Sequence, residues 1–292
     1  MTQTKGTVLI AGATGYLGHY LLRAYAEAGY TVRALARDAE KLTKSDLWID
    51  EVFVGEATDP ATLGGACDGV SLVVSAIGIT RQRDGLTYLD VDYQANRNIL
   101  DLALNAGVKR FAYIHVLNAE NMPSVDMAKA KARFARDLAG APMGSTLISP
   151  SGFFSDLSEI LSMARRGRVY LFGDGEAQMS PIHGFDLAQL CVEATESNAA
   201  YVAAGGPQTF SQNEIAELAF AVLGKPPRIT HIPLWLSRAG VALAKRLGMR
   251  TSIGPIEFFL EASALDMSAP SHGTRTLADE FSTPRSRRAA RA

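Results

Sequence analysis

The chain has 292 residues, of which 47% are hydrophobic and 20% are charged, and this composition favours one large α/β domain with at most a smaller second lobe. The formal net charge of −1 excludes a bulk electrostatic field that would draw the whole protein to nucleic acid or to a membrane. No uninterrupted apolar run is long enough to span a bilayer, and Cys67 and Cys191 have no metal-ligand spacing. No apolar leader precedes the first predicted strand, so we expect a cytoplasmic protein without a metal site.

The first strand and the glycines after it predict a dinucleotide site. Residues 8–11 are apolar and predict a short buried strand, and Gly12, Gly15 and Gly18 follow it at G-x-x-G-x-x-G spacing, before a helix that runs through Ala28. Glycine permits positive φ and close backbone approach, and the helix N-terminus offers free N–H groups and a partial positive charge to a phosphate. A tight turn without a ligand is the alternative, but strand, turn and helix in this order favour a bound pyrophosphate.

The second predicted strand, 30–36, bears on the choice between NADP and NAD. In Rossmann folds an acidic residue at the end of this strand binds a ribose hydroxyl, whereas an arginine there suits a 2′-phosphate. Arg37 ends the strand and Asp38 follows one place later. This order favours NADP (NADPH), and a merely solvated Arg37 is the alternative.

The remaining elements predict an α/β fold, with a doubly wound parallel Rossmann sheet and a smaller, mainly helical C-terminal substrate lobe. Strands are predicted at 52–54, 71–77, 110–116 and 145–149, and helices at 90–106 and 126–140. After residue 155 helices dominate, at 155–166, 186–197, 211–223, 233–247 and 255–265, with short strands near 168–172 and 200–203. We therefore expect a dinucleotide-binding domain at 1–155, a substrate-side lobe at 156–280 packed on the same unit, and a disordered basic tail at 281–292.

Three features of the second half carry further expectations. The segment 233–247 has arginine and lysine inside an apolar pattern, which favours an amphipathic helix that lines a pocket or lies on a membrane surface. His183 is expected to tie its loop to the sheet, and Asp186 to cap a helix that starts near Leu187. A set of large apolar side chains forms either a substrate pocket or, more commonly for such a set, core: Phe153, Phe154, Tyr170, Phe172, Met179, Trp235, Phe258 and Phe259.

Several segments together resemble the short-chain dehydrogenase/reductase superfamily, in its atypical, NmrA-like branch. They are Gly12-Ala-Thr-Gly15-Tyr-Leu-Gly18, Val32–Arg37, Asp92-Tyr-Gln-Ala-Asn96, Ala106–Phe111, Ala130-Lys131, Ser149-Pro-Ser-Gly-Phe153 and Pro181–Ala188. The resemblance covers roughly residues 6–190. It is specific for the fold and for dinucleotide binding, and it does not identify a substrate.

The resemblance assigns roles position by position. It implies that Gly12, Thr14, Gly15, Tyr16 and Leu17 wrap the pyrophosphate, that Arg37 meets the 2′-phosphate, that Glu56 and Ala57 flank adenine, that Ala76, Ile77 and Gly78 line the path of the ribose and nicotinamide, and that Pro150 and Phe153 border the nicotinamide. Where this chain has Glu56 and Ala57, the family usually has Asp and a hydrophobe. Glu offers the same acceptor, one methylene longer.

The superfamily's usual proton-transfer residues are missing. Its Tyr general acid precedes a Lys by four residues, so both lie on one helix face and the Lys cation lowers the pKa of the phenol. Here Met127 precedes Lys131 at that spacing, and Val125 precedes the alternative Lys129. Lys131 is expected to hold the nicotinamide ribose or, alternatively, to be a solvated helix lysine. His115 stands where Ser is common, and its unperturbed pKa of about 6.5 suits proton exchange; a hydrogen-bonded structural histidine is the alternative.

These observations predict an NADPH-dependent reductase of an apolar small molecule, such as a conjugated carbonyl or a quinone, with His115 and Lys131 as catalytic residues. Two alternatives stay open: a non-catalytic NADP-binding sensor or assembly protein, and a cofactor-dependent isomerase or epimerase. The expected partner is the small apolar substrate, with no nucleic acid and no membrane span. The expected oligomeric state is a monomer or a homodimer.

Overall fold

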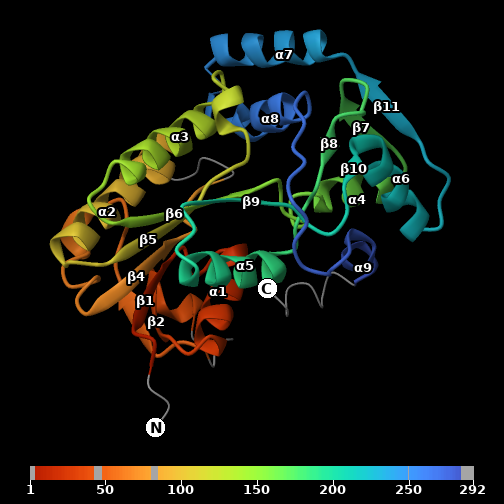
Figure 1. The fold of residues 1–292 in the computed structure, drawn as a ribbon. Helices are drawn as coiled ribbons and strands as arrows, with labels where there is room; N and C mark the ends of the chain where they lie inside the picture. The colour runs from red at the N-terminus through yellow and green to blue at the C-terminus, as the bar shows by residue number, and fades with distance from the viewer. Residues whose placement is uncertain (1–3, 43–47, 80–84, 249, 284–292) are drawn as a thin grey trace.

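A seven-stranded parallel sheet forms the centre of the molecule, a computed structural model that describes residues 4–42, 48–79, 85–248 and 250–283 (Figure 1). The strand order is β3-β2-β1-β4-β5-β6-β9, and every neighbouring pair is parallel. The strands are β1 (Thr7–Ala11), β2 (Thr31–Ala36), β3 (Glu51–Val54), β4 (Val70–Ser75), β5 (Arg110–Ile114), β6 (Gly144–Pro150) and β9 (Tyr201–Ala204). Chain order reverses between β1 and β4, so the sheet is doubly wound and ligands bind beyond the carboxyl ends of these strands. The predicted Rossmann fold is confirmed.

Helices cover both faces of this sheet (Figure 1). One face carries α1 (Tyr16–Glu27) and α5 (Gly184–Glu196), and the other carries a π-helical segment, η3 (Leu89–Ala95), followed by α2 (Asn96–Asn105) and α3 (Asp126–Ala139). Short 3-10 turns lie at η1 (Ala39–Lys41), η2 (Pro60–Thr62) and η4 (Ala119–Asn121). Because both faces are covered, the central strands are apolar throughout rather than alternating. Val8, Leu9 and Ile10 of β1 have no exposed surface.

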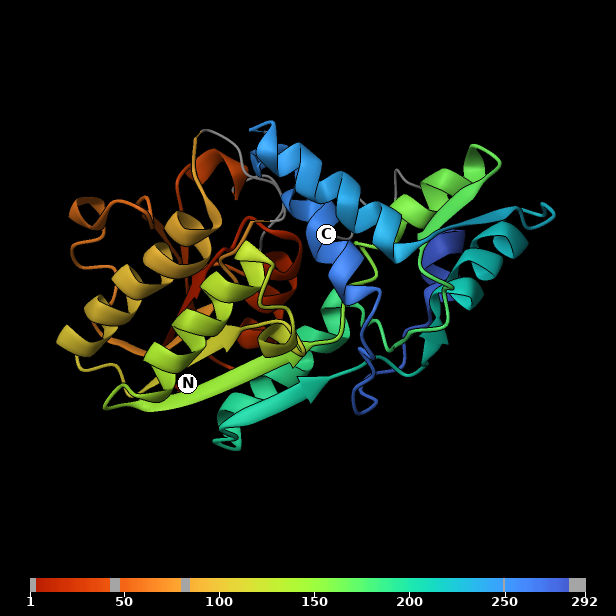
Figure 2. The same ribbon diagram turned by 90° about the horizontal axis from the view of Figure 1, so that it is seen from above.

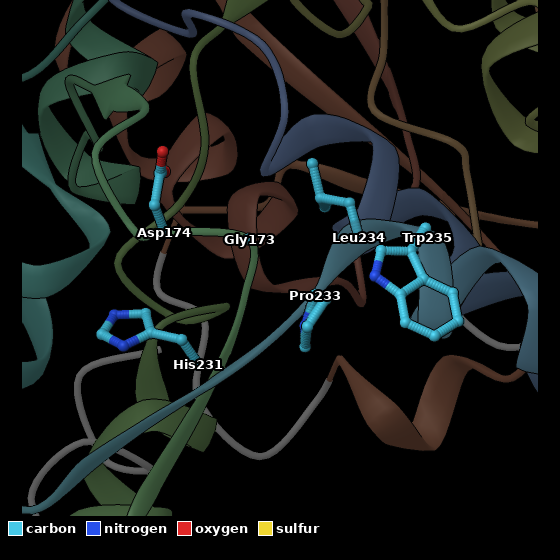
Figure 3. A pocket seen from close by; sticks show the side chains of 6 residues that line it. All are labelled: Gly173, Asp174, His231, Pro233, Leu234 and Trp235. Carbon is cyan, nitrogen blue, oxygen red and sulfur yellow. The ribbon is translucent and has the colours of Figure 1, made fainter.

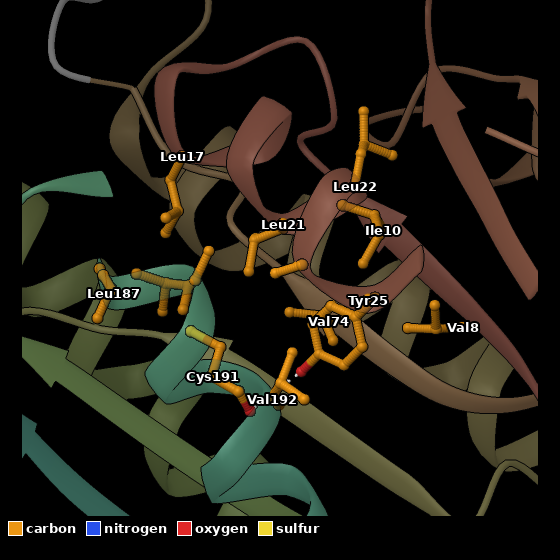
Figure 4. Close-up of a cluster of buried hydrophobic side chains, with 14 of the residues drawn as sticks. Val8, Ile10, Leu17, Leu21, Leu22, Tyr25, Val74, Leu187, Cys191 and Val192 are labelled. Atoms are coloured by element: carbon orange, nitrogen blue, oxygen red, sulfur yellow. Dashed lines mark hydrogen bonds between the residues drawn. The ribbon is translucent and has the colours of Figure 1, made fainter. Parts of the chain in front are cut away.

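The core between β1, α1 and α5 holds the glycine turn against the sheet (Figure 4). Leu21 of α1 and Ile10 of β1 are fully buried there together with Cys191 of α5. Tyr25 lies in the same cluster, and its hydroxyl donates to the carbonyl oxygen of Cys191 at 3.1 Å. Burial of each large apolar side chain stabilises the fold by about 1.5–3 kcal/mol. The packing of Leu21 and Tyr25, later in α1, therefore also holds the first turn of this helix in place.

A smaller lobe lies beside the carboxyl ends of the strands, on the right in Figure 2. Its helices are α4 (Ser158–Arg165), α6 (Gln212–Val222), α7 (Leu234–Arg246), α8 (Arg250–Ala262) and α9 (Leu277–Ser282). Two small sheets join them: β7 (Val169–Phe172) pairs with β11 (Ile229–Ile232) in parallel, and β8 (Gln178–Met179) pairs with β10 (Phe210–Ser211) in antiparallel orientation. The lobe has a core of its own, which includes Leu161, Ile215 and Phe220.

Several elements differ from the expectations set by the sequence. β9 pairs with β6 and α5 packs on α1, so both belong to the sheet unit although they fall within 156–280. Phe281, placed in the expected tail, lies in α9 and is 2% exposed, and residues 284–292 lie outside the described part of the chain. The patterns missed β8, β10 and β11, because such short strands carry too little alternation to be recognised. The division into a cofactor part and a substrate part stays a prediction.

The start of α5 shows that one predicted cap is wrong. The helix begins at Gly184, and its N-cap is His183, whose Nδ1 accepts a hydrogen bond from the backbone N–H of Phe185 at 3.0 Å. Asp186 therefore lies inside the first turn. Its carboxylate pairs with the guanidinium of Arg275 at 2.6 Å and accepts the backbone N–H of the same residue at 3.0 Å. Asp186 thus ties the segment before α9 to the sheet unit.

Candidate functional site

The glycine turn between β1 and α1 has the geometry of a phosphate site. Gly12 has φ +86°, and a Cβ there would lie 2.9 Å from the carbonyl of Ala76 on the neighbouring strand connection. A Cβ on Gly18 would run into the carbonyl oxygen of Gly12 and lie 2.6 Å from that of Ala13. Gly15 is the N-cap of α1 and provides no side-chain cap, and the first turn carries no acidic residue. The turn is compact, and its helix N-terminus is free to favour a negatively charged ligand.

The aromatic residue after the turn links it to two later segments. The hydroxyl of Tyr16 accepts a hydrogen bond from the backbone N–H of Gly184 at 3.0 Å. Its ring makes an edge contact with Phe153, with centroids 5.9 Å apart. Burial raises the pKa of Tyr16 above its usual value, so this phenol stays protonated at neutral pH. Tyr16 thus brings Phe153, which is predicted to border the nicotinamide, against the predicted pyrophosphate turn. Of the other residues predicted at this turn, Thr14 is exposed and Leu17 is buried in the core.

The end of β2 presents an available cation. The Arg37 side chain is 61% exposed, and its Nε lies 3.6 Å from Glu56 Oε2. Asp38 is occupied locally, because its side chain caps η1 by accepting the backbone N–H of Glu40 at 3.0 Å. Arg33 is held inside the unit by Glu51, at 2.7 Å. Arg37 is therefore the more accessible of the two arginines of this strand and its end.

The residues after β4 are fixed by a buried polar contact. The hydroxyl of Ser75 donates to Asn96 Oδ1 at 2.5 Å, and the amide of Asn96 donates to the carbonyl of Asp92 at 3.0 Å. The backbone N–H of Ala76 bonds the carbonyl of Ala11 at 2.9 Å. These bonds hold the Ala76-Ile77-Gly78 segment beside the glycine turn. At the position predicted to flank adenine, the carbonyl of Ala57 accepts a hydrogen bond from the side-chain amide of Asn98 at 3.0 Å.

Lys131 is buried and paired, which the sequence did not predict. Its Nζ lies 3.2 Å from Asp92 Oδ1, 3.4 Å from the hydroxyl of Tyr113 and 3.4 Å from the carbonyl of Ile114. The Lys131 side chain is 12% exposed and that of Asp92 is fully buried. A Cβ on Gly78 would lie 2.9 Å from Nζ. Gly78 therefore lets the lysine head reach the edge of the predicted nicotinamide path, and the alternative of a solvated lysine is wrong.

Charge and burial determine how this group of residues titrates. Burial acts to lower the pKa of Lys131, but Tyr113, Asp92 and their hydrogen bonds together raise it above its usual value. Burial raises the pKa of Tyr113 to about 12, against the opposing charge of Lys131. Lys131 is thus a cation and Tyr113 a neutral phenol at neutral pH. Tyr113 supplies a phenol beside the lysine, but from a strand, and it is fully buried.

His115 and Ser149 lie at the carboxyl ends of two neighbouring strands, and their polar side-chain atoms form no hydrogen bond within the described residues, although His115 Nε2 lies 3.8 Å from Glu120 Oε1. The backbone N–H of His115 donates to the carbonyl of Ile148 at 2.8 Å, which places His115 beside Ser149 in the parallel register. His115 is 4% exposed and Ser149 1% exposed. Within the described residues, no partner lies within hydrogen-bond distance of either imidazole nitrogen of His115 or the hydroxyl of Ser149. Buried polar atoms left unpaired need an explanation, and a ligand group is one.

The environment of His115 changes its expected chemistry. Burial and the nearby charge of Lys131 lower the pKa of His115 to about 3. The imidazole is then neutral near pH 7, so the unperturbed value used in the sequence argument does not apply here. A neutral imidazole donates a hydrogen bond from one nitrogen and accepts at the other.

A carboxyl group after β6 was missed altogether. Pro150 ends β6, and Asp156 Oδ2 accepts the backbone N–H of Phe153 at 3.4 Å. Burial raises the pKa of Asp156 to about 6. Sequence gives no sign of this, because Asp156 falls in the first turn of the helix predicted at 155–166, where an acidic residue is common. Asp92 had a detectable signal: it is a carboxylate on the apolar face of the helix predicted at 90–106.

A hollow lies in the lobe, away from the glycine turn. It has a volume of about 530 Å³ and is lined by Gly173, Asp174, His231, Pro233, Leu234 and Trp235 (Figure 3). None of the predicted site residues lines it. Of the predicted apolar set Trp235 alone lines this hollow, whereas Phe154 is buried in the lobe core and Tyr170 is 52% exposed. Among the described residues, no helix is long and apolar enough to cross a bilayer.

Known proteins resemble this chain over most of its length. The family model described as "NmrA-like family" matches residues 4–266. A photosystem II assembly factor of Synechocystis sp. is 26% identical over 236 residues, which cover 79% of this chain and 72% of that protein. A chloroplastic divinyl chlorophyllide a 8-vinyl-reductase of Oryza sativa subsp. indica is 27% identical over 270 residues, covering 84% and 66% respectively.

Solved structures share the fold. An NADPH-dependent quinone oxidoreductase of Escherichia coli, complexed with NADPH, superposes with a TM-score of 0.76 at 20% identity and covers 94% of this chain and 98% of its own. A UDP-glucose 4-epimerase of Thermus thermophilus, in complex with NAD, gives a TM-score of 0.65 at 14% identity, covering 78% and 86%. At these identities the structures establish the fold alone. The family match spans most of the sequence, and the chain therefore belongs to the NmrA-like family.

Proposed function

We propose that the protein is an NADPH-dependent reductase of an apolar small molecule, such as a conjugated carbonyl or a quinone. The observation that carries this proposal is the glycine turn, whose open helix N-terminus lies beside the Ala76–Gly78 segment and, through Gly78, beside the Lys131 cation. The names of two similar proteins support it, a divinyl chlorophyllide a 8-vinyl-reductase and an NADPH-dependent quinone oxidoreductase. The predicted cytoplasmic location and the predicted monomer or homodimer stay predictions.

The residues predicted from sequence would hold the dinucleotide as follows. Gly12, Thr14, Gly15, Tyr16 and Leu17 would surround the pyrophosphate, Arg37 the 2′-phosphate, Glu56 and Ala57 the adenine, Ala76, Ile77 and Gly78 the ribose and nicotinamide, and Pro150 and Phe153 the far side of the nicotinamide. The tight spaces at Gly12 and Gly18 fit this assignment, because any larger residue would force the turn open. The exposed Arg37, with Glu56 at 3.6 Å, and the occupied Asp38 support NADP over NAD.

A bound nicotinamide cofactor supplies hydride in such a site. Lys131, a buried cation at the edge of the path, would bind a ribose hydroxyl or stabilise negative charge on a substrate oxygen. His115, neutral at pH 7, would donate a hydrogen bond to a substrate carbonyl oxygen. Its proposed catalytic role therefore becomes that of a neutral donor instead of an imidazolium acid.

Cofactor choice and turnover test the proposal separately. In Arg37→Ala we expect the Kd for NADPH to rise about tenfold, since one charge-assisted hydrogen bond is worth about 1.5 kcal/mol, with the Kd for NADH unchanged. Arg23→Ala, which removes an exposed arginine in the second half of α1, is the matched control. An unchanged NADPH/NADH ratio in Arg37→Ala would refute the assignment of NADP.

Turnover is then measured as loss of NADPH absorbance with a panel of quinones and conjugated carbonyls. Oxidation of NADPH by at least one of them supports the reductase. Tight NADPH binding with no oxidation by any of them contradicts it and favours the second candidate, a non-catalytic NADP-binding assembly protein. The similarity to a photosystem II assembly factor and the missing Tyr at position 127 favour that candidate. Product rearrangement without net NADPH loss would instead indicate an isomerase or epimerase.

A further inference from the structure

Helix α7 is exposed along its whole length. None of its residues, Leu234–Arg246, is buried. It lies at the edge of the molecule with α8 behind it (Figure 1). Trp235 is 71% exposed at its start, and Figure 3 shows its ring beside the hollow of the lobe. A helix in this position normally has a polar outer face, and this one does not.

The outer face of α7 is an apolar stripe. Leu234, Val241 and Ala244 are partly buried and form the inner face. Leu236, Leu243 and Leu247 follow a spacing of seven and four residues, which places them on one side of the helix. Leu236 also borders a hollow that Val241 and Ala244 share with Ile253 of α8, so this side flanks the contact with α8. These three leucines are 50%, 59% and 70% exposed. A stripe of this kind on a soluble protein indicates a surface that binds something apolar.

The charge around α7 indicates what binds there. From residue 218 to residue 256 the sequence has no Asp or Glu, and α7 itself carries Arg238, Lys245 and Arg246. This local excess is hidden in the net charge of −1 for the whole chain. Basic amphipathic helices that carry leucine and tryptophan are typical of membrane-surface segments.

The carboxylates near α7 neutralise only its inner side. Glu261 of α8 binds Arg238 at 2.8 Å, and Glu257 of α8 binds Lys245. Arg246 is exposed and adjoins Leu243 and Leu247 on the outer side. Asp174 lies across the hollow from Trp235. A second copy of the chain on this stripe would bring like charges of two α7 helices together, which disfavours a symmetric dimer here.

We propose that α7 is a membrane-surface helix that binds an anionic lipid bilayer through Trp235, Leu236, Leu243 and Leu247, with Arg246 contacting lipid headgroups. The apolar stripe enters the boundary between headgroups and acyl chains, and the helix lies in the plane of the surface. This proposal concerns binding alone and does not depend on the proposed reaction.

Sedimentation with vesicles tests it directly. The full chain should sediment with vesicles of phosphatidylglycerol and phosphatidylcholine and bind pure phosphatidylcholine vesicles at least tenfold more weakly. The chain has two tryptophans, so Trp48→Phe leaves Trp235 as the only reporter. Its emission should shift to the blue when the anionic vesicles are added. Unshifted emission, or equal binding to both vesicles, overturns the proposal.

Surface variants identify the binding face. The triple variant Leu236→Glu, Leu243→Glu, Leu247→Glu should lose vesicle binding while its circular dichroism and Tm stay those of the parent, because all three side chains are at least half exposed. Arg246→Ala should weaken binding about fivefold, as one cation near an anionic surface contributes about 1 kcal/mol. Tyr201→Glu, at a similarly exposed aromatic on β9, is the control and should bind normally. Full vesicle binding by the triple variant overturns the proposal. So does a concentration-dependent dimer of the parent that the triple variant does not form, because the stripe would then bind a second copy of the chain.

Discussion

Asp156 allows a quantitative test of burial next to the candidate site. Its carboxylate accepts the backbone N–H of Phe153, and burial raises its pKa from 3.8 to about 6. The difference, 6 − 3.8, is about 2 pKa units, and each unit corresponds to about 1.4 kcal/mol of differential interaction. The charged form of Asp156 is therefore less stable in the folded protein than in water by roughly 3 kcal/mol.

The sign of the pH dependence follows from the raised pKa. Below pH 4 the Asp156 carboxyl is protonated in the folded and unfolded states alike. No charge is then buried, so ionisation of Asp156 does not lower the free energy of unfolding. As the pH rises from about 4 through 6, the unfolded chain loses the proton first, so stability falls and then levels off above pH 6. Asp156→Asn keeps an oxygen acceptor for the Phe153 N–H but cannot ionise.

Urea unfolding followed by circular dichroism measures the effect. We expect Asp156→Asn to exceed the parent in free energy of unfolding by up to about 3 kcal/mol at pH 8, and by close to zero near pH 4. Asp68→Asn, at an exposed aspartate, is the control and should change little at either pH. An equal gain at pH 4 and pH 8 would show that the substitution acts through packing, and a loss at pH 8 would contradict the burial argument.

Two further substitutions test the site's construction. Gly18→Ala should abolish NADPH binding or prevent folding, because its Cβ meets backbone oxygens of Gly12 and Ala13 that belong to the turn itself. Gly64→Ala is the control, because open space surrounds its Cβ. It should match the parent in an NADPH-binding titration and in Tm. Lys131→Met should lower the free energy of unfolding by about 3–5 kcal/mol, because it leaves Asp92 buried without its cation. Adding Asp92→Asn should restore part of that loss, and a double variant no more stable than the single one would argue against the pair.

The sheet and the glycine turn were predictable because their signals are local. Apolar strands, glycines at fixed spacing and the residue ending β2 all act within a few positions of one another. Gly12 needs positive φ and Gly18 needs close helix contact, so the sequence carries these requirements directly.

The partners of Lys131 were not predictable, since they depend on contacts between distant segments. Asp92 comes from η3, and Tyr113 comes from β5. Nothing in the spacing around Lys131 names either residue. For the same reason the pairing of β7 with β11 was missed, because β8, α5, β9, β10 and α6 come between the two strands in the chain. Burial also reversed one expectation, since the pKa of His115 falls to about 3 instead of remaining near neutrality.

The surroundings of Lys131 explain why a reductase on this scaffold would favour substrates that need little proton transfer. The position of the usual Tyr is taken by Met127, which is buried among the core residues that include Tyr113. Tyr113 itself stays protonated and is fully buried, so it cannot exchange a proton with substrate. With Lys131 held by Asp92 and His115 neutral, Asp156 is a carboxyl beside Phe153 whose pKa burial raises to about 6. Quinones and conjugated carbonyls accept hydride to give stabilised anions, which can take their proton later from water. The proposed substrates therefore do not need a Tyr general acid in the site at the moment of hydride transfer.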